Sequence, residues 1–317
     1  MKIALCGNFV VDYCSEVHYK RTLEAMGHTV IPLQENQLRT EEILRQATFS
    51  DLFVWVHSHG FKNRGRYTMG QVLQQLAARN VPTMGYHLDL YMGLQRWQDY
   101  QSHDYFKVKH FFTVDKLMAD WLNENTQTKG YYLPPGVLEQ ECYLADPHPE
   151  YKQEVVFTGA RGYHHEWAYR PMMIDFLAKT YGDKFGHFGG DGIKLMRGNE
   201  LNQLYASSKV VVGDTLNIGF SYPYYSSDRF YEVMGRGGFL IYPKIENFAP
   251  DYEDGKHVVY YKHGDLNDLK EKIDYYLAHD KEREKIRLAG HELTKSKNTY
   301  TNRWQTMIDE VEKHRNG

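Results

Sequence analysis

Short runs of apolar residues alternate with longer amphipathic stretches through the first half of the chain. The runs at 2–6, 51–56 and 111–114 predict buried strands, because a strand covered on both faces is apolar along its whole length. The stretches at 16–26 and 69–78 repeat apolar residues every three or four positions and predict helices. This regular alternation favours an α/β domain, in which helices cover both faces of a parallel sheet.

The pattern starts again after a polar stretch. Residues 136–153 contain two prolines and have the composition of a linker. Apolar runs at 154–158 and 185–188, with a helical pattern over 170–180, then predict a second Rossmann-like domain. The expected organisation is an N-terminal domain over 1–145, a C-terminal domain over 146–298, and a terminal helix within 299–317.

Composition narrows the class of protein. The chain has 317 residues, enough for two domains, and a net charge of −3, which gives no general attraction to nucleic acid. Its three cysteines form no metal or redox spacing. The sequence shows neither a signal peptide nor a membrane span, so we expect a cytoplasmic protein. The 26 tyrosines offer platforms for sugars and bases.

Residues 227–243 are the most informative stretch. They predict a short helix, a glycine turn and a buried strand, with Ser227 as the N-cap. Apolar residues at i, i+3 and i+4 form the core face, which turns Arg229 and Glu232 in other directions. A Gly- and Ser-rich loop leads into this helix, and its backbone N–H groups could hold a phosphate.

Asp228-Arg-x-x-Glu232, followed by Gly-Gly-Phe-Leu240, resembles the donor-nucleotide segment of GT-B glycosyltransferases. The likeness is to the CgeB-like (spore-maturation-type) branch and to the glycosyltransferase group 1 family. It implies two Rossmann-like domains with an interdomain cleft, and a C-terminal helix that crosses back to the first. It also implies that Glu232 binds the donor ribose. Many retaining members carry a second glutamate where this chain has Tyr224, so the stereochemical outcome stays open.

The resemblance also places donor-binding residues in loops after strands. Arg161 and Arg170 follow the first strand of the second domain, and arginine suits bidentate contact with a phosphate. Arg170 could equally mark a helix start. Gly190 is expected near the nucleotide base or in a plain turn. The expected donor-binding residues are Gly7, Arg161, Arg170, Gly190, Ser227, Arg229 and Glu232.

Polar residues follow the strands of the first domain as well, where open α/β sheets bind ligands. His57 and His59 follow one predicted strand, and Asp89 follows another. The resemblance places Asp89 at the mouth of the cleft, facing the acceptor hydroxyl. A carboxylate there could deprotonate the hydroxyl. The alternative is that Asp89 is a helix N-cap.

The same residues permit a different class of enzyme. His57, His59, His87 and Asp89 have the residue types of a three- or four-ligand metal site, as in a metal-dependent hydrolase. GT-B enzymes generally need no metal. With the transferase we therefore expect no metal and no cofactor, the nucleotide sugar being a substrate.

Lys62, Arg64 and Arg66 form a cationic loop with two aromatic neighbours. Cations interleaved with rings suit a phosphorylated acceptor or nucleic acid, and the alternative is a solvated charged loop. We expect this cationic loop to bind the acceptor.

These observations predict a metal-independent glycosyltransferase of the hexosyltransferase type. It would move a sugar from a nucleotide diphosphate sugar, with UDP as the expected nucleotide, to a hydroxyl of a glycan, a small molecule or hydroxymethylated DNA. One alternative is a phage-type DNA glycosyltransferase acting on hydroxymethylated bases. Alternatives of another class are an inactive nucleotide-sugar-binding protein and the hydrolase. The sugar, the acceptor and the oligomeric state stay open.

Overall fold

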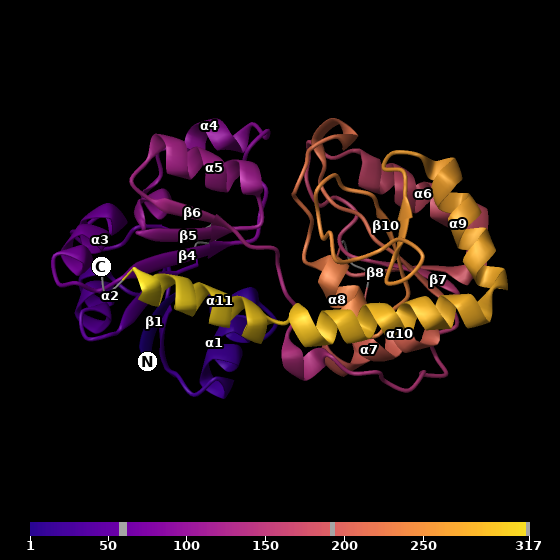
Figure 1. Ribbon diagram of the computed structural model, residues 1–317, viewed down its shortest axis with the longest axis horizontal. Coiled ribbons are helices and arrows are strands. Elements are labelled where there is room, and N and C mark those ends of the chain that lie inside the picture. The colour runs from indigo at the N-terminus through magenta and orange to yellow at the C-terminus, as the bar shows by residue number, and fades with distance from the viewer. Residues whose placement is uncertain (57–61, 191–193, 315–317) are drawn as a thin grey trace. The chain divides into compact units, whose positions relative to one another are not determined.

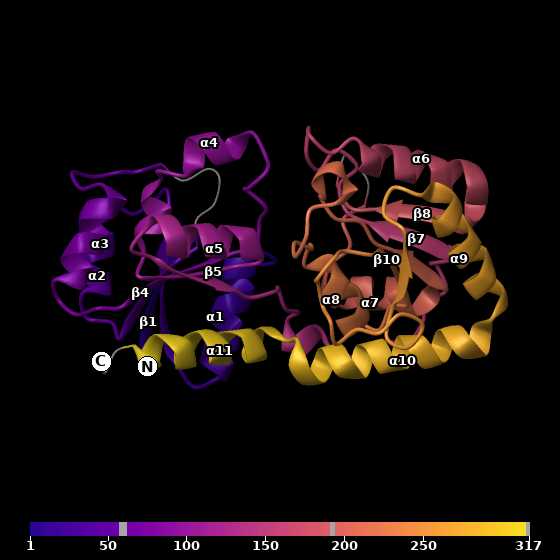
Figure 2. The same ribbon diagram turned by 45° about the horizontal axis from the view of Figure 1, so that its top comes forward.

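The chain forms two compact units, each built around one parallel sheet (Figures 1 and 2). The computed structural model describes residues 1–56, 62–190 and 194–314. Unit 1 comprises Met1–Pro134 and Tyr300–Gly317, and unit 2 comprises Pro135–Thr299. The chain therefore leaves unit 1 at the Leu133-Pro-Pro-Gly136 segment and returns to it for the last helix.

Unit 1 has a six-stranded sheet in the order β2-β1-β3-β4-β5-β6, with every pair parallel. Parallel strands need crossover helices, which explains the alternation of apolar runs and amphipathic stretches in the sequence. The strands are β1 (Lys2–Gly7), β2 (Thr29–Gln34), β3 (Leu52–Trp55), β4 (Thr83–His87), β5 (His110–Thr113) and β6 (Lys129–Tyr132).

Helices cover both faces of this sheet. α2, α3 and α5 share one hydrophobic cluster, while α1 packs with α11 on the other face (Figure 1). The ring of Tyr19 lies 5.1 Å from that of Tyr300 and 5.4 Å from that of Trp304, which confirms that the C-terminal helix packs back on the first domain. The helices are α1 (Ser15–Ala25), α2 (Thr40–Ala47), α3 (Met69–Ala77), α4 (Arg96–Tyr100), α5 (Lys116–Asn125) and α11 (Tyr300–Lys313).

Unit 2 has a five-stranded parallel sheet in the order β11-β10-β9-β7-β8. The chain runs from β7 to β8 on one side and then to β9 on the other, so the strand order reverses at β7. In open α/β sheets, ligands bind beside the carboxyl ends of the strands at such a reversal. The strands are β7 (Val155–Thr158), β8 (Phe185–Phe188), β9 (Val210–Val212), β10 (Leu240–Pro243) and β11 (Val259–Tyr261).

The helices of unit 2 lie on both faces, with α6 and α9 opposite α7, α8 and α10 (Figure 2). As predicted, Phe230, Val233 and Met234 of α8 are buried. Ser227 is not the N-cap of α8, because Asp228 occupies that position and the Ser227 hydroxyl donates to the Asp214 backbone carbonyl at 3.3 Å. The helices are α6 (Tyr169–Tyr181), α7 (Gly198–Ser207), α8 (Arg229–Gly235), α9 (Leu266–Ala278) and α10 (Asp280–Lys297).

The stretch predicted as a linker, 136–153, packs on unit 2 instead. Val137, Leu138 and Cys142 are each at most 3% exposed. Val137 also forms an isolated parallel bridge with Thr299. Residues 143–153 are exposed or half-buried, so only the first part of the segment is buried. Prolines and overall polarity did not reveal these few apolar contacts.

Candidate functional site

A cavity of about 240 Å³ lies in unit 2 at the carboxyl ends of β7 and β8. The loops that follow these two strands form part of its wall, and residues of α6, α7 and α8 complete it. Arg170, Arg197, Arg229 and Glu232 are its charged lining residues. A cavity with three guanidinium groups and one carboxylate is suited to an anionic ligand that also carries hydroxyl groups.

Glycines let the two loops approach each other closely. Gly159, Gly189 and Gly190 have φ values of +142°, +95° and +89°, a region that residues with a side chain rarely adopt. A Cβ atom on Gly190 would lie 2.8 Å from the Cα of Ala160. The loop after β8 therefore packs directly on the loop after β7 only because no side chain separates them.

Arg229 lies against the same loop. A Cβ on Gly159 would come within 3.1 Å of the Arg229 guanidinium, so this glycine also makes room for the cation. Burial tends to lower the pKa of Arg229, but the carboxylates of Asp228 and Glu232 outweigh it and raise the pKa. The buried Nε of Arg229 has no hydrogen-bond partner within the described part of the chain. Arg229 thus places a permanent positive charge on the cavity wall.

Arg170 forms a second part of the wall and is only 2% exposed. Its Nε donates to Asp214 Oδ2 at 2.8 Å, and its NH1 donates to the Ala160 carbonyl at 3.3 Å. Arg170 was predicted from the sequence, whereas Asp214 was not. The available signal was an acidic residue two positions after the apolar run of β9, in the region where ligand-binding residues of parallel sheets gather.

Glu232 forms an ion pair with Arg236, one turn further along, at the C-terminal end of α8. The Nε of Arg236 lies 3.4 Å from Glu232 Oε1, and its NH1 donates to Asn202 Oδ1 at 2.7 Å. Arg236 is 2% exposed and also pairs with Glu141. Burial of this guanidinium among three polar partners fixes its position, and with it one side of Glu232. Arg236, like Asp214, was not predicted from the sequence.

The other expected donor-binding residues lie in different surroundings. Gly190 lines the cavity, whereas Arg161 does not and instead forms two hydrogen bonds, of 2.7 and 2.6 Å, with Asp175 of α6. The Ser227 hydroxyl also lies 3.2 Å from that of Tyr242. Gly7 belongs to unit 1, at the end of β1.

In unit 1, Asp89 follows β4 and starts no helix, since the next helix begins at Arg96. The N-cap alternative for Asp89 is therefore wrong. His87 is 3% exposed, and its ring packs edge-on against Tyr105 with centroids 5.6 Å apart. His57 and His59 lie outside the described residues. Over 1–56, 62–190 and 194–314, no group of three or more His, Cys, Asp or Glu side chains could hold a metal ion.

The cationic loop is exposed but its backbone is anchored. The Lys62 N–H donates to Asn36 Oδ1 at 2.5 Å, and the Arg64 carbonyl accepts from the Thr40 N–H at 2.7 Å. These contacts tie the loop to the connection between β2 and α2 and to the first residue of α2. The Arg66 guanidinium donates a hydrogen bond to the hydroxyl of the next residue, Tyr67, at 2.7 Å. The three cationic side chains thus extend from a loop whose backbone is held by hydrogen bonds.

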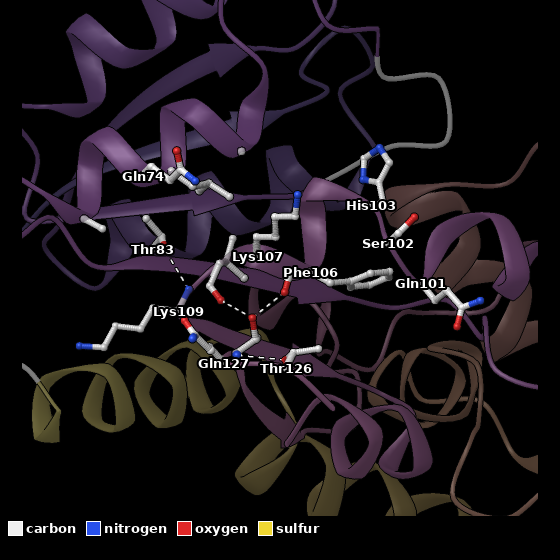
Figure 3. Close-up of a pocket in the computed structure, with 15 residues that line it drawn as sticks. Gln74, Thr83, Gln101, Ser102, His103, Phe106, Lys107, Lys109, Thr126 and Gln127 are labelled. Atoms are coloured by element: carbon white, nitrogen blue, oxygen red, sulfur yellow. Dashed lines mark hydrogen bonds between the residues drawn. The ribbon is translucent and has the colours of Figure 1, made fainter. Parts of the chain in front are cut away.

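A larger cavity, of about 570 Å³, lies in unit 1 (Figure 3). It opens at the amino ends of β4, β5 and β6, where Thr83, Lys109 and Thr128 line it. The Lys109 N–H donates to Thr83 Oγ1 at 2.8 Å, and Thr128 Oγ1 donates to the Val108 carbonyl at 2.8 Å. These hydroxyls hold strands together, and parallel sheets bind ligands at the opposite edge. The smaller cavity in unit 2 is therefore the candidate site.

No helix in the described parts of the chain is both long and apolar enough to cross a membrane.

Comparison with known families covers the region of the candidate site. Residues 162–309, a little under half the chain, match the model of the family described as glycosyl transferase-like. This match includes Arg170, Asp214, Arg229 and Glu232. The sequence matches no curated protein.

Solved structures are similar over nearly the whole chain. A glycosyltransferase from Rickettsia africae ESF-5 aligns with a TM-score of 0.67 at 13% identity, covering 98% of both chains. Anabaena Alr3699/HepE in complex with UDP and glucose aligns at 0.64 with 12% identity, covering 99% of this chain and 100% of that one. An α-glucosyltransferase in complex with UDP-glucose and DNA containing an abasic site aligns at 0.72 with 10% identity, covering 98% and 99%. The chain therefore has the predicted GT-B fold of two parallel-sheet α/β domains.

Proposed function

We propose that this protein is a CgeB-like glycosyltransferase that moves a hexose from a UDP-sugar to an acceptor hydroxyl. The observation that carries the proposal is the cavity in unit 2, which Arg170, Arg197, Arg229 and Glu232 line together with two glycine loops. The family match over residues 162–309 and the UDP named for two structural neighbours support it.

The charge of the cavity suits the leaving group of this reaction. When the bond from the sugar to the diphosphate breaks, negative charge grows on the diphosphate, and fixed guanidinium groups stabilise it without needing to reorganise. Glu232 supplies two acceptor oxygens for the ribose hydroxyls. On the acceptor side we propose Asp89 as the base. His57 and His59, which lie outside the described residues, are proposed to act with it.

Nucleotide titration tests the donor site. UDP at a hundred times its dissociation constant should stabilise the protein by about 2.7 kcal/mol, which a thermal-shift or calorimetric titration detects. Failure of UDP, GDP, ADP and dTDP alike to bind would contradict the proposal. Binding of UDP without any release of UDP from UDP-sugars would instead favour the inactive nucleotide-sugar-binding protein.

Arginines would perform the role that a divalent cation performs in other transferases, so the proposed reaction needs no metal. EDTA should leave UDP affinity and turnover unchanged. A stoichiometric, tightly bound zinc ion, lost together with activity on chelation, would favour the metal-dependent hydrolase.

Hydroxymethylated DNA is a second candidate acceptor. The cationic loop in unit 1 favours it, and the structurally similar α-glucosyltransferase is in complex with DNA. Transfer of a radiolabelled sugar to a hydroxymethylated duplex, but not to the same duplex without hydroxymethyl groups, would support this acceptor. Equal inertness of both duplexes beside an active glycan acceptor would exclude it.

A further inference from the structure

A fully buried carboxylate lies behind the arginines of the candidate site. Asp214, two residues after β9, has no exposed side-chain surface. Its Oδ2 accepts hydrogen bonds from Arg170 Nε at 2.8 Å and from Trp167 Nε1 at 2.9 Å. The Nε2 of His263 lies 3.7 Å from its other oxygen, Oδ1. Asp214 thus connects Arg170 to groups that line no part of the cavity.

Burial makes this pair interdependent. Removing a guanidinium or a carboxylate from water costs several kcal/mol per ion, so each is tolerated here because it faces the other. Burial tends to raise the pKa of the Asp214 carboxyl, but the nearby His263 ring, the charge and hydrogen bond of Arg170 and the hydrogen bond of Trp167 outweigh it and lower the pKa. The carboxylate therefore stays charged and holds the guanidinium in place.

The pair also orients the donors of Arg170. One N–H goes to Asp214 and one to the Ala160 carbonyl, and the guanidinium carbon lies 4.5 Å from the centre of the Tyr163 ring. The remaining three N–H donors, on the terminal nitrogens, have no partner among the residues that the structure describes. They belong to a side chain that lines the cavity, so they are the donors left for a ligand.

Asp214 also contacts the segment that leads into α8, which carries Arg229. The Ser227 hydroxyl donates to the Asp214 carbonyl at 3.3 Å, and the Ser227 N–H donates to Thr215 Oγ1 at 3.1 Å. Ser227 lies two residues before Arg229, the first residue of α8. The adjacent residues Asp214 and Thr215 therefore hold Arg170 through the Asp214 carboxylate, and hold the entry to α8 through the Asp214 carbonyl and the Thr215 hydroxyl.

We propose that Asp214 is the positioning residue of this site: it holds Arg170, with Trp167 fixing the carboxylate, in the orientation that binds the donor diphosphate. This inference rests on the proposed function. Asp214 touches no substrate itself and acts through Arg170. Its loss should therefore resemble the loss of the Arg170 charge.

A double-mutant cycle with UDP binding as the readout tests this role. Asp214→Asn keeps the volume and an acceptor for Trp167 but removes the charge, and Arg170→Met removes the guanidinium. Each should weaken UDP binding about 10- to 100-fold, the range for a charge-assisted hydrogen bond. The two together should weaken it no further, because both changes remove one unit.

Two further variants separate positioning from folding. Arg170→Lys can still pair with Asp214, but one ammonium group cannot hold Asp214 and reach the cavity at once. We expect it to melt near the wild-type temperature and yet to lose UDP affinity. The matched control is Glu154→Gln, which removes a carboxylate at the opposite end of β7 that pairs with Lys184 and Lys209. UDP affinity should be unchanged in this control.

The outcomes distinguish the inference from the proposed function. If the wild type binds UDP and Asp214→Asn binds it equally well, or if the two losses multiply in the double variant, the positioning role is overturned and the donor site stands. If Asp214→Asn does not fold, wild-type affinity in Arg170→Lys overturns the inference instead. If the wild type binds no nucleotide, the proposed function fails and the inference fails with it.

Discussion

The first strand of each unit leads to a glycine, and side chains of opposite charge cover the two glycines. In unit 1, β1 ends at Gly7, where an added Cβ would lie 2.7 Å from the Cγ of Glu16. In unit 2, Gly159 follows β7, and an added Cβ would lie 3.1 Å from the Arg229 guanidinium. Two sheets of the same type thus present opposite charges at the same place in the fold.

The neighbouring residues extend the contrast. In unit 1, the Glu35 N–H donates to the Gly7 carbonyl at 2.9 Å, and Glu35 is 1% exposed. In unit 2, Arg170 donates to Ala160, the residue after Gly159. Because a phosphate at Gly7 would face a carboxylate, the contrast favours unit 2 for the diphosphate. The contrast also shows that the type of fold does not by itself determine the ligand. A single side chain beside the glycine decides whether the end of the first strand is negatively or positively charged.

Removing the guanidinium of Arg229 should have the largest effect on this contrast. Arg229→Met should weaken UDP binding about 10- to 100-fold, because a charge-assisted contact to phosphate is lost. Isothermal titration measures it. Glu16→Gln is the matched control in unit 1 and should leave UDP affinity unchanged. Equal losses from the two changes would mean that the nucleotide does not distinguish the strand ends.

Glu232 of unit 2 is expected to contact the ribose of the nucleotide. Glu232→Ala should weaken UDP binding by about 1.5–3 kcal/mol, since hydrogen bonds to a charged acceptor disappear. The wild type should bind UDP more tightly than 2′-deoxy-UDP, and the variant should bind the two equally. Titration of both nucleotides into both proteins gives the four affinities. A variant that still prefers UDP would place the ribose elsewhere.

The cationic loop tests whether unit 1 has an anionic ligand of its own. If the acceptor is duplex DNA, the logarithm of affinity should fall with the logarithm of salt concentration, with a slope of about −0.9 per neutralised phosphate. Replacing all three cations by Ala should flatten the slope by about two to three units and leave UDP binding intact. Fluorescence anisotropy at several salt concentrations measures this. An unchanged slope would remove the loop from the acceptor site.

The smallest expected effect is on stability, with opposite signs in the two units. Burial raises the pKa of Glu16, so its contribution to stability falls as pH rises from its unfolded pKa through its folded pKa. The pKa of Asp214 is lowered despite its burial, so its contribution is present above its unfolded pKa and is lost as pH falls through its folded pKa.

Glu16→Gln should therefore remove a decline of stability with rising pH, and Asp214→Asn should remove a gain. Each titrating group changes the free energy of unfolding by at most about 1.4 kcal/mol per pH unit. Denaturant unfolding followed over a pH series measures both slopes. For each variant, the difference in unfolding free energy from the wild type is plotted against pH. If the two plots slope in the same direction, the contrast between the units is contradicted.

Most strands were predicted from the sequence, because apolar runs at regular spacing are a clear signal of buried parallel strands. The strand β11 and the helices α2, α4, α7, α9 and α10 were not predicted. α10 contributes few buried residues among many charges, so its apolar period is faint. The faint apolar period, and not the length, thus hid α10, which has 18 residues.

The candidate site was predicted in part. The structure brings Arg170, Gly190, Arg229 and Glu232 to one cavity, as loops after strands and a helix start suggest. Local patterns could not show that Arg161 pairs with Asp175 or that Asp214 pairs with Arg170 across 44 residues. Such partners depend on the register of the sheet and on which strands are neighbours.

Aromatic composition was equally ambiguous. The tyrosines suggested platforms for sugars and bases, yet Tyr19, Tyr86 and Tyr105 are at most 1% exposed. Tyr105 packs edge-on against Trp55 and Phe111, with ring centroids 5.2 and 5.0 Å apart. A count of rings cannot separate a ligand platform from a core, because the same amphipathic side chain serves both.

The return of α11 to unit 1 has a consequence for synthesis on the ribosome. Tyr19 of α1 meets Tyr300 and Trp304, which emerge only after the whole of unit 2 has been made. Unit 2 is continuous in sequence and can fold as it leaves the ribosome, whereas unit 1 begins first and is completed last. Until then the side of α1 that α11 covers stays exposed, and a nascent chain arrested before residue 300 should depend on chaperones that unit 2 does not need.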